Sequence, residues 1–184
     1  GEEEYNRFLA VIFPHDQLKI LPYNRVVRDL NGLSGAGFLE RLGQRYSIEE
    51  TMSGTPPGPR RFCMYLDGRW RLLAPRFKPE GDIVARLDVS VLQTTILEPL
   101  LGIHDPRKDM RIDFVGGMRG LAELERLVRD GGFAAAFSLF PTSIEELIAV
   151  ADNGGLMPPK STWFEPKLRS GLVIHRIEPG AGGK

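Results

Sequence analysis

The proline-rich stretch at residues 153–177 carries the side chains of this sequence that are best suited to bind an anion. Its three prolines fix φ and withhold backbone N–H groups, so most of the stretch is expected to be neither helix nor central strand. Its single acidic residue is Glu165, and its cations and hydroxyl groups include Lys160, Lys167, Arg169, Ser161 and Thr162. These groups predict a rigid basic loop that binds phosphate or carboxylate.

The same loop also has a structural interpretation. Its lysines and arginines could cap carbonyl groups and pair with surface carboxylates, while their stems cover apolar surface. The Lys160-Ser161-Thr162 run resembles the end of a phosphate-binding P-loop, but Pro159 stands where that motif requires glycine. The P-loop is therefore rejected, and both interpretations of the basic loop stay open.

A glycine turn at residues 116–120 is the second candidate for anion binding. It is predicted to connect a strand with a helix, so its backbone N–H groups and the helix N-terminus could hold an anion. The residues concerned are Gly116, Gly117, Arg119 and Gly120. Their spacing is not that of a dinucleotide-binding loop, and a tight turn explains the glycines equally well.

Catalytic residues and cofactors stay unassigned. The three histidines are isolated, without the spacing of a metal-binding helix, so no metal site is predicted. Cys63 lies among apolar residues of a predicted strand, which favours an inert buried thiol. Asp113 precedes the glycine turn and could be a general base, although a structural cap is the commoner role.

Composition restricts the class of protein. A chain of 184 residues with 42% hydrophobic and 26% charged residues is typical of one globular domain. The formal net charge of +0 argues against a nucleic-acid partner, since phosphate-backbone binding needs excess positive charge. A single cysteine favours a reducing cytoplasm, and no apolar run is long enough to cross a membrane.

The first half of the chain is predicted to consist of hairpins and one helix. The apolar run at residues 8–13 and the segment at 18–27 are expected to pair as strands, the second interrupted by Pro22. Ser34 is a plausible N-cap for an amphipathic helix. Asp67-Gly68 between two apolar runs predicts a two-residue hairpin turn.

The second half alternates helices and strands. Asp88 is expected to cap a helix, and Thr142 with Glu145 to form a capping box for a later one. Strands are expected at residues 112–115 and 133–140, with a helix over 121–128 between them. This alternation favours crossovers and some parallel pairing. The fold class is therefore α/β or α+β, a mixed sheet of hairpins and crossover strands with helices packed against it.

We expect residues 1–177 to form a single domain and the glycine-rich residues 178–184 to be disordered. The chain starts at Gly1 and enters an apolar run almost at once. This start favours a fragment of a longer protein.

Four phrases carry a family resemblance. They are F-P-H-D-Q-L-K-I-L-P-Y-N-R-V-V at 13–27, R-I-D-F-V-G-G at 111–117, P-T-S-I-E-E-L at 141–147 and M-P-P-K-S-T-W-F-E-P-K-L-R-S-G-L at 157–172. The chain resembles the C-terminal half of a bacterial and archaeal domain-of-unknown-function family, number one thousand and fifteen. Members of that family have an upstream Asp-Gly-His-His-Arg phrase similar to the nucleotide-handling motif of ParB-like and free-serine-kinase proteins. The resemblance implies that an upstream half with the catalytic motif is missing here, and Arg25 is a further residue that could meet a phosphate.

Three functional hypotheses follow. In the first, the chain is a non-catalytic part of a cytoplasmic protein and completes a cleft for a small anion, with the basic loop and the glycine turn as its two sides. In the second, it belongs to a phosphotransferase that acts on a small hydroxy amino acid such as serine. In the third, it is a structural or protein-interaction module.

Overall fold

The computed structural model describes residues 3–175, and the predicted tail at 178–184 lies outside the described residues. The chain divides into two compact units, one formed by Ile20–Trp163 and the other by Gly1–Lys19 with Phe164–Lys184. The larger unit contains a six-stranded sheet with the strand order β3-β5-β4-β7-β2-β6. Its strands are β2 (Tyr23–Val27), β3 (Tyr46–Thr51), β4 (Phe62–Leu66), β5 (Arg69–Pro75), β6 (Ile112–Gly116) and β7 (Ala135–Leu139).

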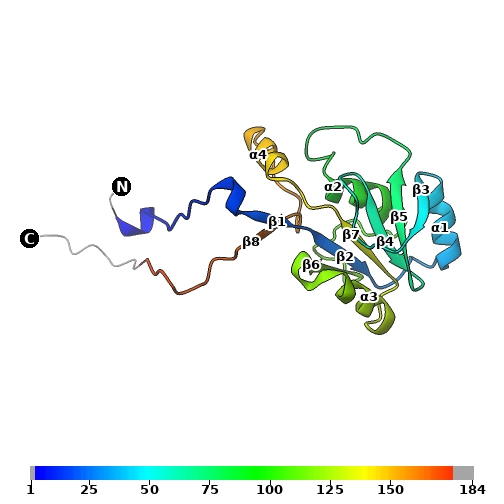
Figure 1. Cartoon of the computed structure of the whole chain (residues 1–184). Coiled ribbons are helices and arrows are strands. Elements are labelled where there is room, and N and C mark those ends of the chain that lie inside the picture. Colours follow the sequence, from blue (N-terminus) through cyan, green and yellow to red (C-terminus); the bar gives the residue numbers. More distant parts are fainter. Residues whose placement is uncertain (1–2, 176–184) are drawn as a thin grey trace, which may run out of the picture. The chain divides into compact units, whose positions relative to one another are not determined.

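The predicted fold class is confirmed, since helices pack against a sheet in a mixed α/β arrangement (Figure 1). The expectation of parallel pairing is wrong. All five ladders of the six-stranded sheet are antiparallel. The alternation of strand and helix indicated crossovers, but β6 and β7 both pair with β2, which runs antiparallel to each of them.

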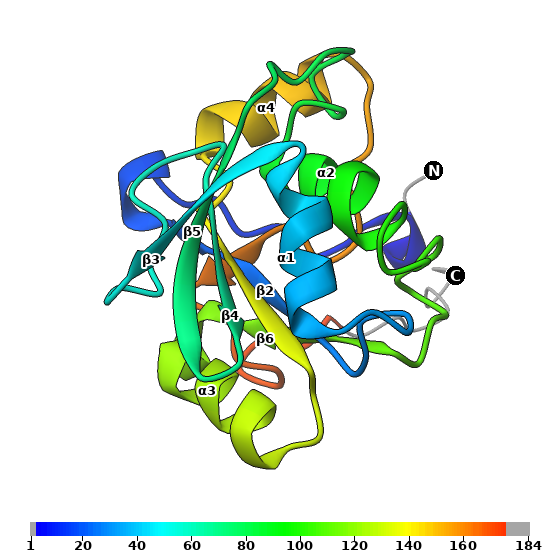
Figure 2. The ribbon, with the colours of Figure 1, turned by 90° about the vertical axis from the view of Figure 1, so that its right-hand side faces the viewer.

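Alternate residues along each strand serve two separate cores, because successive side chains of a strand point to opposite faces. Val27, Phe137 and Met64 belong to the larger core, which also contains buried residues of α1 (Gly35–Gly43) and α2 (Asp88–Leu92). Val26 and Ala136 belong to the smaller core, which contains Leu124 of α3 (Gly120–Asp130). One face of the sheet therefore packs against α1 and α2, and the other against α3 (Figure 2).

Local sequence signals account for several elements. The Ser34 hydroxyl accepts a hydrogen bond from the Gly37 N–H at 3.1 Å and caps α1, as predicted. Asp67 and Gly68 have φ values of 50° and 76°, as a two-residue hairpin between β4 and β5 requires. Strand β3, which follows α1 directly, was not predicted.

Two predicted helix caps are wrong in detail. The capping box of α4 (Ile144–Asp152) is formed by Ser143 and Glu146, one residue later than expected. The hydroxyl of Thr142 does not cap the helix and instead donates to the carbonyl oxygen of Ser161 at 3.3 Å. The side chain of Asp88 makes no cap hydrogen bond and instead accepts one from the Arg60 N–H at 2.9 Å.

The predicted hairpin of residues 8–13 with residues 18–27 is also wrong. Residues 8–13 form no strand, and Phe8 and Ile12 are 86% and 93% exposed. An apolar run becomes a strand only where another strand supplies hydrogen-bond partners. The residues after it form β1 (Lys19–Leu21), which pairs with β8 (Trp163–Glu165) in a two-stranded sheet. Pro22 separates β1 from β2, as its missing N–H predicts.

Candidate functional site

Arg25 is a buried cation on β2, on the face of the sheet that packs against α1 and α2. It is 4% exposed, and its guanidinium donates hydrogen bonds to the carbonyl oxygens of Tyr23 and, at 3.0 Å, Lys160. The guanidinium also lies 5.3 Å from the centre of the Phe114 ring. Within residues 3–175, no carboxylate forms an ion pair with it. Burial lowers the pKa of Arg25 to about 9, because desolvation disfavours the charged form, yet the group is still cationic at neutral pH.

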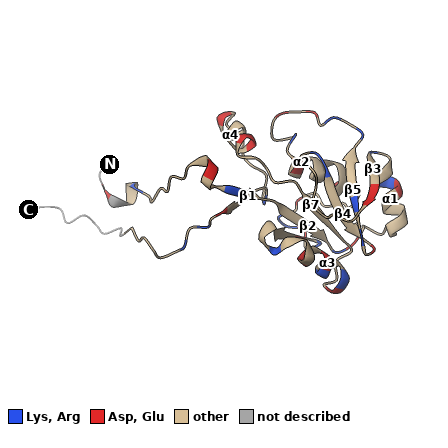
Figure 3. Cartoon of the chain, in the orientation of Figure 1, with Lys and Arg blue, Asp and Glu red and all other residues tan. Residues whose placement is uncertain are grey.

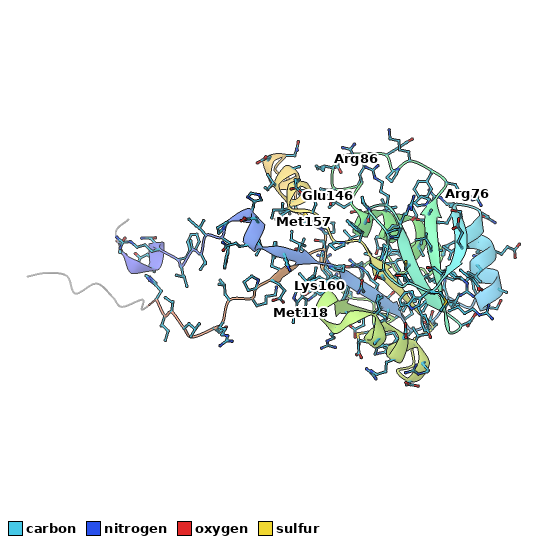
Figure 4. All side chains as sticks on the ribbon, viewed as in Figure 1. Arg76, Arg86, Met118, Glu146, Met157 and Lys160 are labelled. Atoms are coloured by element: carbon cyan, nitrogen blue, oxygen red, sulfur yellow. The ribbon has the colours of Figure 1, made fainter. Side chains whose placement is uncertain are left out.

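The segment that holds the Lys160 carbonyl in place is itself anchored. Lys160 has a φ of 53°, a left-handed conformation that is uncommon for a residue with a side chain. Ser161 beside it is only 4% exposed, and its carbonyl oxygen accepts the hydrogen bond from Thr142. Lys160, which Figure 4 labels, lies on the segment between α4 and β8 and places its ammonium 5.4 Å from the centre of the Tyr23 ring.

Arg25 lines a hollow of about 580 Å³, a volume in the range of small-molecule sites. The start of the α2 helix, the π-helical turn Gln93–Leu97 and the loop after it form most of the wall. The polar and charged residues around Arg25 are Ser90, Gln93, Thr94, His104, Asp105 and Arg107. A second hollow of about 600 Å³, which Lys160 lines, shares Pro106, Arg107, Phe114 and Pro159 with the first.

Most other cations around these hollows already have acidic partners. Arg107 and Lys108 both pair with Asp105, at 3.0 and 3.8 Å. A hydrogen bond from Arg111 holds the pKa of Asp109 below its usual value. Figure 3 shows the same mixture of basic and acidic residues along many elements. Arg25, Arg28 and Lys160 differ, since none of them has an acidic partner within the described part of the chain; the Arg28 guanidinium instead lies 4.4 Å from the centre of the Phe133 ring.

The structure places part of the glycine turn, Gly117 and Gly120, beside the α3 face of the sheet. Gly117 and Gly120 line a third hollow, of about 430 Å³, together with Leu121 of α3. The N–H of Gly117 donates to the carbonyl oxygen of Pro22 at 2.8 Å, and the N–H of Gly120 donates to Gly117. Among the described residues, Lys160 and the turn residues Gly117 and Gly120 therefore line different hollows.

The other predicted residues fall into three places. Gly116 is packed against the Trp163 ring, since a Cβ atom there would lie 2.5 Å from it. Arg119 is exposed and lies 4.0 Å from Glu123. Lys167 and Arg169 are exposed and belong to the other unit, where the Lys167 ammonium lies 6.0 Å from the centre of the Phe164 ring. Ser161 and half-buried Thr162 follow Lys160 directly.

Sequence reasoning missed the wall of the hollow that faces Arg25. Ser90, Gln93 and Thr94 come from a helical segment whose apolar spacing was the only signal used. The polar residues between those apolar positions were given no role. His104 was set aside as an isolated histidine in a loop, and only the folded chain places it beside Arg25 in the same wall.

Residues 3–175 contain neither a metal-binding cluster nor a membrane-spanning helix. No group of three or more histidine, cysteine, aspartate or glutamate residues is arranged there to hold a metal ion. None of the helices within that range has the length and apolar character that crossing a membrane requires.

Comparison with known proteins gives a family and distant structural neighbours. Residues 1–90 match the model of a family described as "Protein of unknown function (DUF1015)". No curated protein matches the sequence. A solved structure of a free serine kinase in complex with AMP is similar with a TM-score of 0.46 and 15% identity, over 81% of this chain and 54% of that chain. A conserved hypothetical protein from Pyrococcus furiosus gives 0.48 and 14%, over 81% and 56%. The chain thus spans about half the length of these structures.

Proposed function

The chain belongs to the DUF1015 family of proteins of unknown function, and we propose that it binds a small anion, phosphate or carboxylate, in the hollow beside Arg25. One observation carries this proposal: a guanidinium that is 4% exposed has no acidic partner within residues 3–175. An uncompensated buried charge lowers the free energy of unfolding by roughly several kcal/mol. An anion in the hollow would offset that cost.

The hydrogen-bonding capacity of Arg25 supports the same conclusion. A guanidinium has five N–H donors, about two of which are used here by the carbonyl groups of Tyr23 and Lys160. These two bonds fix the plane of the group, so its other donors are held in a constant geometry. Planar and preorganised donors are well suited to phosphate or carboxylate.

Neighbouring groups extend this cation into a site. Ser90 supplies a hydroxyl donor and Gln93 its remaining amide N–H from one wall of the hollow, whereas the Thr94 hydroxyl already donates to the Ser90 carbonyl oxygen at 2.9 Å. Lys160 lines the adjoining hollow and brings a second positive charge without an acidic partner in the described chain. The proposed ligand group is therefore a dianionic phosphate or a carboxylate, bound by Arg25 and oriented by Ser90 and Gln93.

Thermal unfolding in the presence of phosphate tests the proposal. Phosphate, compared with chloride at equal ionic strength, should raise Tm, because a ligand that binds only the folded chain stabilises it by mass action. At a phosphate concentration 100 times Kd, the free energy of unfolding should rise by about 2.7 kcal/mol. Arg25→Gln should abolish the shift, and Lys160→Ala should reduce it. Arg69→Gln is the matched control, because Arg69 is an exposed arginine that pairs with Glu50.

An equal phosphate response in Arg25→Gln and in the unmodified chain would overturn the proposal. If Arg25→Gln does not fold, phosphate titration of Ser90→Ala by ³¹P NMR decides instead, since Ser90 lines the hollow from a half-buried position; an unchanged phosphate affinity in this variant would overturn the proposal. The two other hypotheses differ in outcome. A phosphotransferase would consume nucleotide in the presence of serine, and a purely structural module would respond to no anion. It stays a prediction that Lys167, Arg169 and the glycine turn bind an anion. The cytoplasmic location and the absence of a nucleic-acid partner also stay predictions.

A further inference from the structure

Two buried polar side chains meet on the α3 face of the sheet. Asn24 and Ser138 are 2% and 3% exposed. The antiparallel register that pairs Arg25 with Phe137 brings Asn24 of β2 alongside Ser138 of β7, one residue further on. A direct bond confirms this neighbourhood, since the Asn24 Oδ1 atom accepts the Leu139 N–H at 3.2 Å.

Both side chains retain unused hydrogen-bonding capacity. The Asn24 side-chain amide uses its oxygen for Leu139, while its nitrogen donates to no group in residues 3–175. The Ser138 hydroxyl likewise has no partner among those residues. No described side-chain nitrogen or oxygen is both sealed from solvent and without a partner, so these polar atoms must be reachable from a cavity. Asn24 and Ser138 both line the third hollow, of about 430 Å³, beside the glycine turn.

The walls of this hollow determine which chemistry it accepts. Every residue that lines it is uncharged, and most of the lining is proline, glycine, leucine and phenylalanine. Cys63 pairs with Ser138 in the sheet, and burial raises the pKa of its thiol to about 11, so it adds no charge nearby. A carboxylate or phosphate would lose its hydration here without meeting a cation, which is unfavourable.

We propose that Asn24 and Ser138 form a second ligand site, which binds a neutral carbonyl group attached to a small apolar body, such as an amide. The Asn24 amide nitrogen and the Ser138 hydroxyl donate to the carbonyl oxygen, and the proline and leucine side chains of the wall contact the apolar body. This site is separate from the anion site, because consecutive residues of β2 point to opposite faces: Arg25 into one hollow and Asn24 into the other.

The two glycines of the turn that line the hollow are consistent with this assignment. Gly120 has a φ of 70° and no atom within 4 Å of the place where a Cβ would stand, so the turn adds no bulk at the rim of the hollow. Gly117 instead lies against Pro22, which a Cβ would approach to 2.8 Å. The glycines thus shape the rim, while the polar selectivity comes from Asn24 and Ser138.

The test uses two probes of nearly equal shape. Isobutyramide is neutral, and isobutyrate carries a charge at the same position. In ¹H–¹⁵N correlation NMR of the ¹⁵N-labelled chain, isobutyramide should cause saturable shifts of the Asn24 side-chain amide and of the Ser138 and Gly117 N–H signals. A probe this small is expected to bind with a Kd on the order of 1–10 mM. Isobutyrate should bind at least about fivefold more weakly.

Two variants and one control make the result decisive. Asn24→Asp keeps an oxygen for the Leu139 N–H but removes the amide donor, and should weaken isobutyramide binding at least about tenfold. Ser138→Val removes the hydroxyl and fills part of the hollow, and should abolish binding. Ser47→Ala removes a serine on β3 that bonds to the Ala74 carbonyl and should bind normally. Shifts that do not saturate, or tighter binding of isobutyrate than of isobutyramide, would overturn the proposal. Normal isobutyramide binding by Ser138→Val would also overturn it, even if Asn24→Asp fails to fold.

Discussion

The Arg25 guanidinium donates to the Lys160 carbonyl oxygen at 3.0 Å, although the two residues are 135 positions apart in the chain. This bond joins the central part of the sheet to the proline-rich segment that sequence reasoning singled out. It also fixes the orientation of the guanidinium that we propose as an anion ligand.

The substitution Arg25→Lys tests whether the anion site needs the planar guanidinium or only its positive charge. A lysine keeps the charge but has no planar fork, so it cannot hold the Tyr23 and Lys160 carbonyl groups and an anion together. We expect phosphate affinity to fall about tenfold and the free energy of unfolding to drop by roughly 1–2 kcal/mol, as for a lost buried hydrogen bond. Phosphate titration and urea unfolding measure the two effects. Unchanged affinity would mean that charge alone, without the fork, is sufficient.

Gly116→Ala tests the contact between the glycine turn and Trp163. The added methyl group would lie 2.5 Å from the indole ring, and φ at this position is −62°, so steric overlap rather than backbone strain is at issue. We expect a loss of roughly 1–3 kcal/mol in urea unfolding, with a change in tryptophan fluorescence. Gly43→Ala in α1 is the control. It meets no atom within 4 Å and should stabilise by about 0.5–1 kcal/mol. Equal effects of the two substitutions would contradict this account.

Asp88 predicts a pH dependence of stability. Burial raises its pKa to about 6 from 3.8, with a smaller contribution from Glu146. Between these two values the folded protein holds the proton more tightly than the unfolded chain, so the Asp88 contribution to stability falls as pH rises from about 4 to 6. Asp88→Asn keeps an oxygen for the Arg60 N–H. It should therefore be more stable than the unmodified chain at pH 7 by roughly 1–2 kcal/mol, and equally stable near pH 4. Urea unfolding across this pH range measures the difference, and an advantage that persists at pH 4 would rule out titration as its cause.

Cys63 should react only after the chain unfolds. The thiol is 1% exposed, and burial raises its pKa to about 11, so little thiolate forms at pH 8. Labelling with a disulfide reagent should be at least about 100-fold slower in buffer than in concentrated urea. Rapid labelling in buffer would show that the β4 strand opens locally.

Signals that act within a few residues predicted local structure well. The Asp67-Gly68 turn and the Ser34 cap depend on neighbouring backbone groups, and both are as expected. The capping box of α4 was misplaced by one residue, because Thr142 and Ser143 have the same local chemistry. Only the long-range bond from Thr142 to Ser161 decides between them. The predicted strand at residues 8–13 was wrong for a related reason, since the apolar character of a segment does not reveal whether a partner strand exists.

The candidate site was predicted only in part. The charge and stiffness of the Lys160 segment were visible in the sequence, but its neighbours depend on how distant elements pack. Nothing in the sequence indicated that Arg25 would be buried without an acidic partner, or that Gly117 and Gly120 would line a different hollow from Lys160. A weak signal for the third hollow did exist: Ser138 is the one polar residue in the apolar run at 133–140. It was interpreted as an ordinary strand residue.

The alternation of β2 has a consequence for how this protein can vary. Asn24 and Arg25 are adjacent in the chain yet serve different hollows, so a point substitution at either one can retune one compartment and spare the other. An inserted or deleted residue between Pro22 and Val26 would instead exchange the two environments, burying a guanidinium among apolar groups and exposing an amide to the anion. Among functional homologues we therefore expect substitutions at these two positions but a strictly constant strand length.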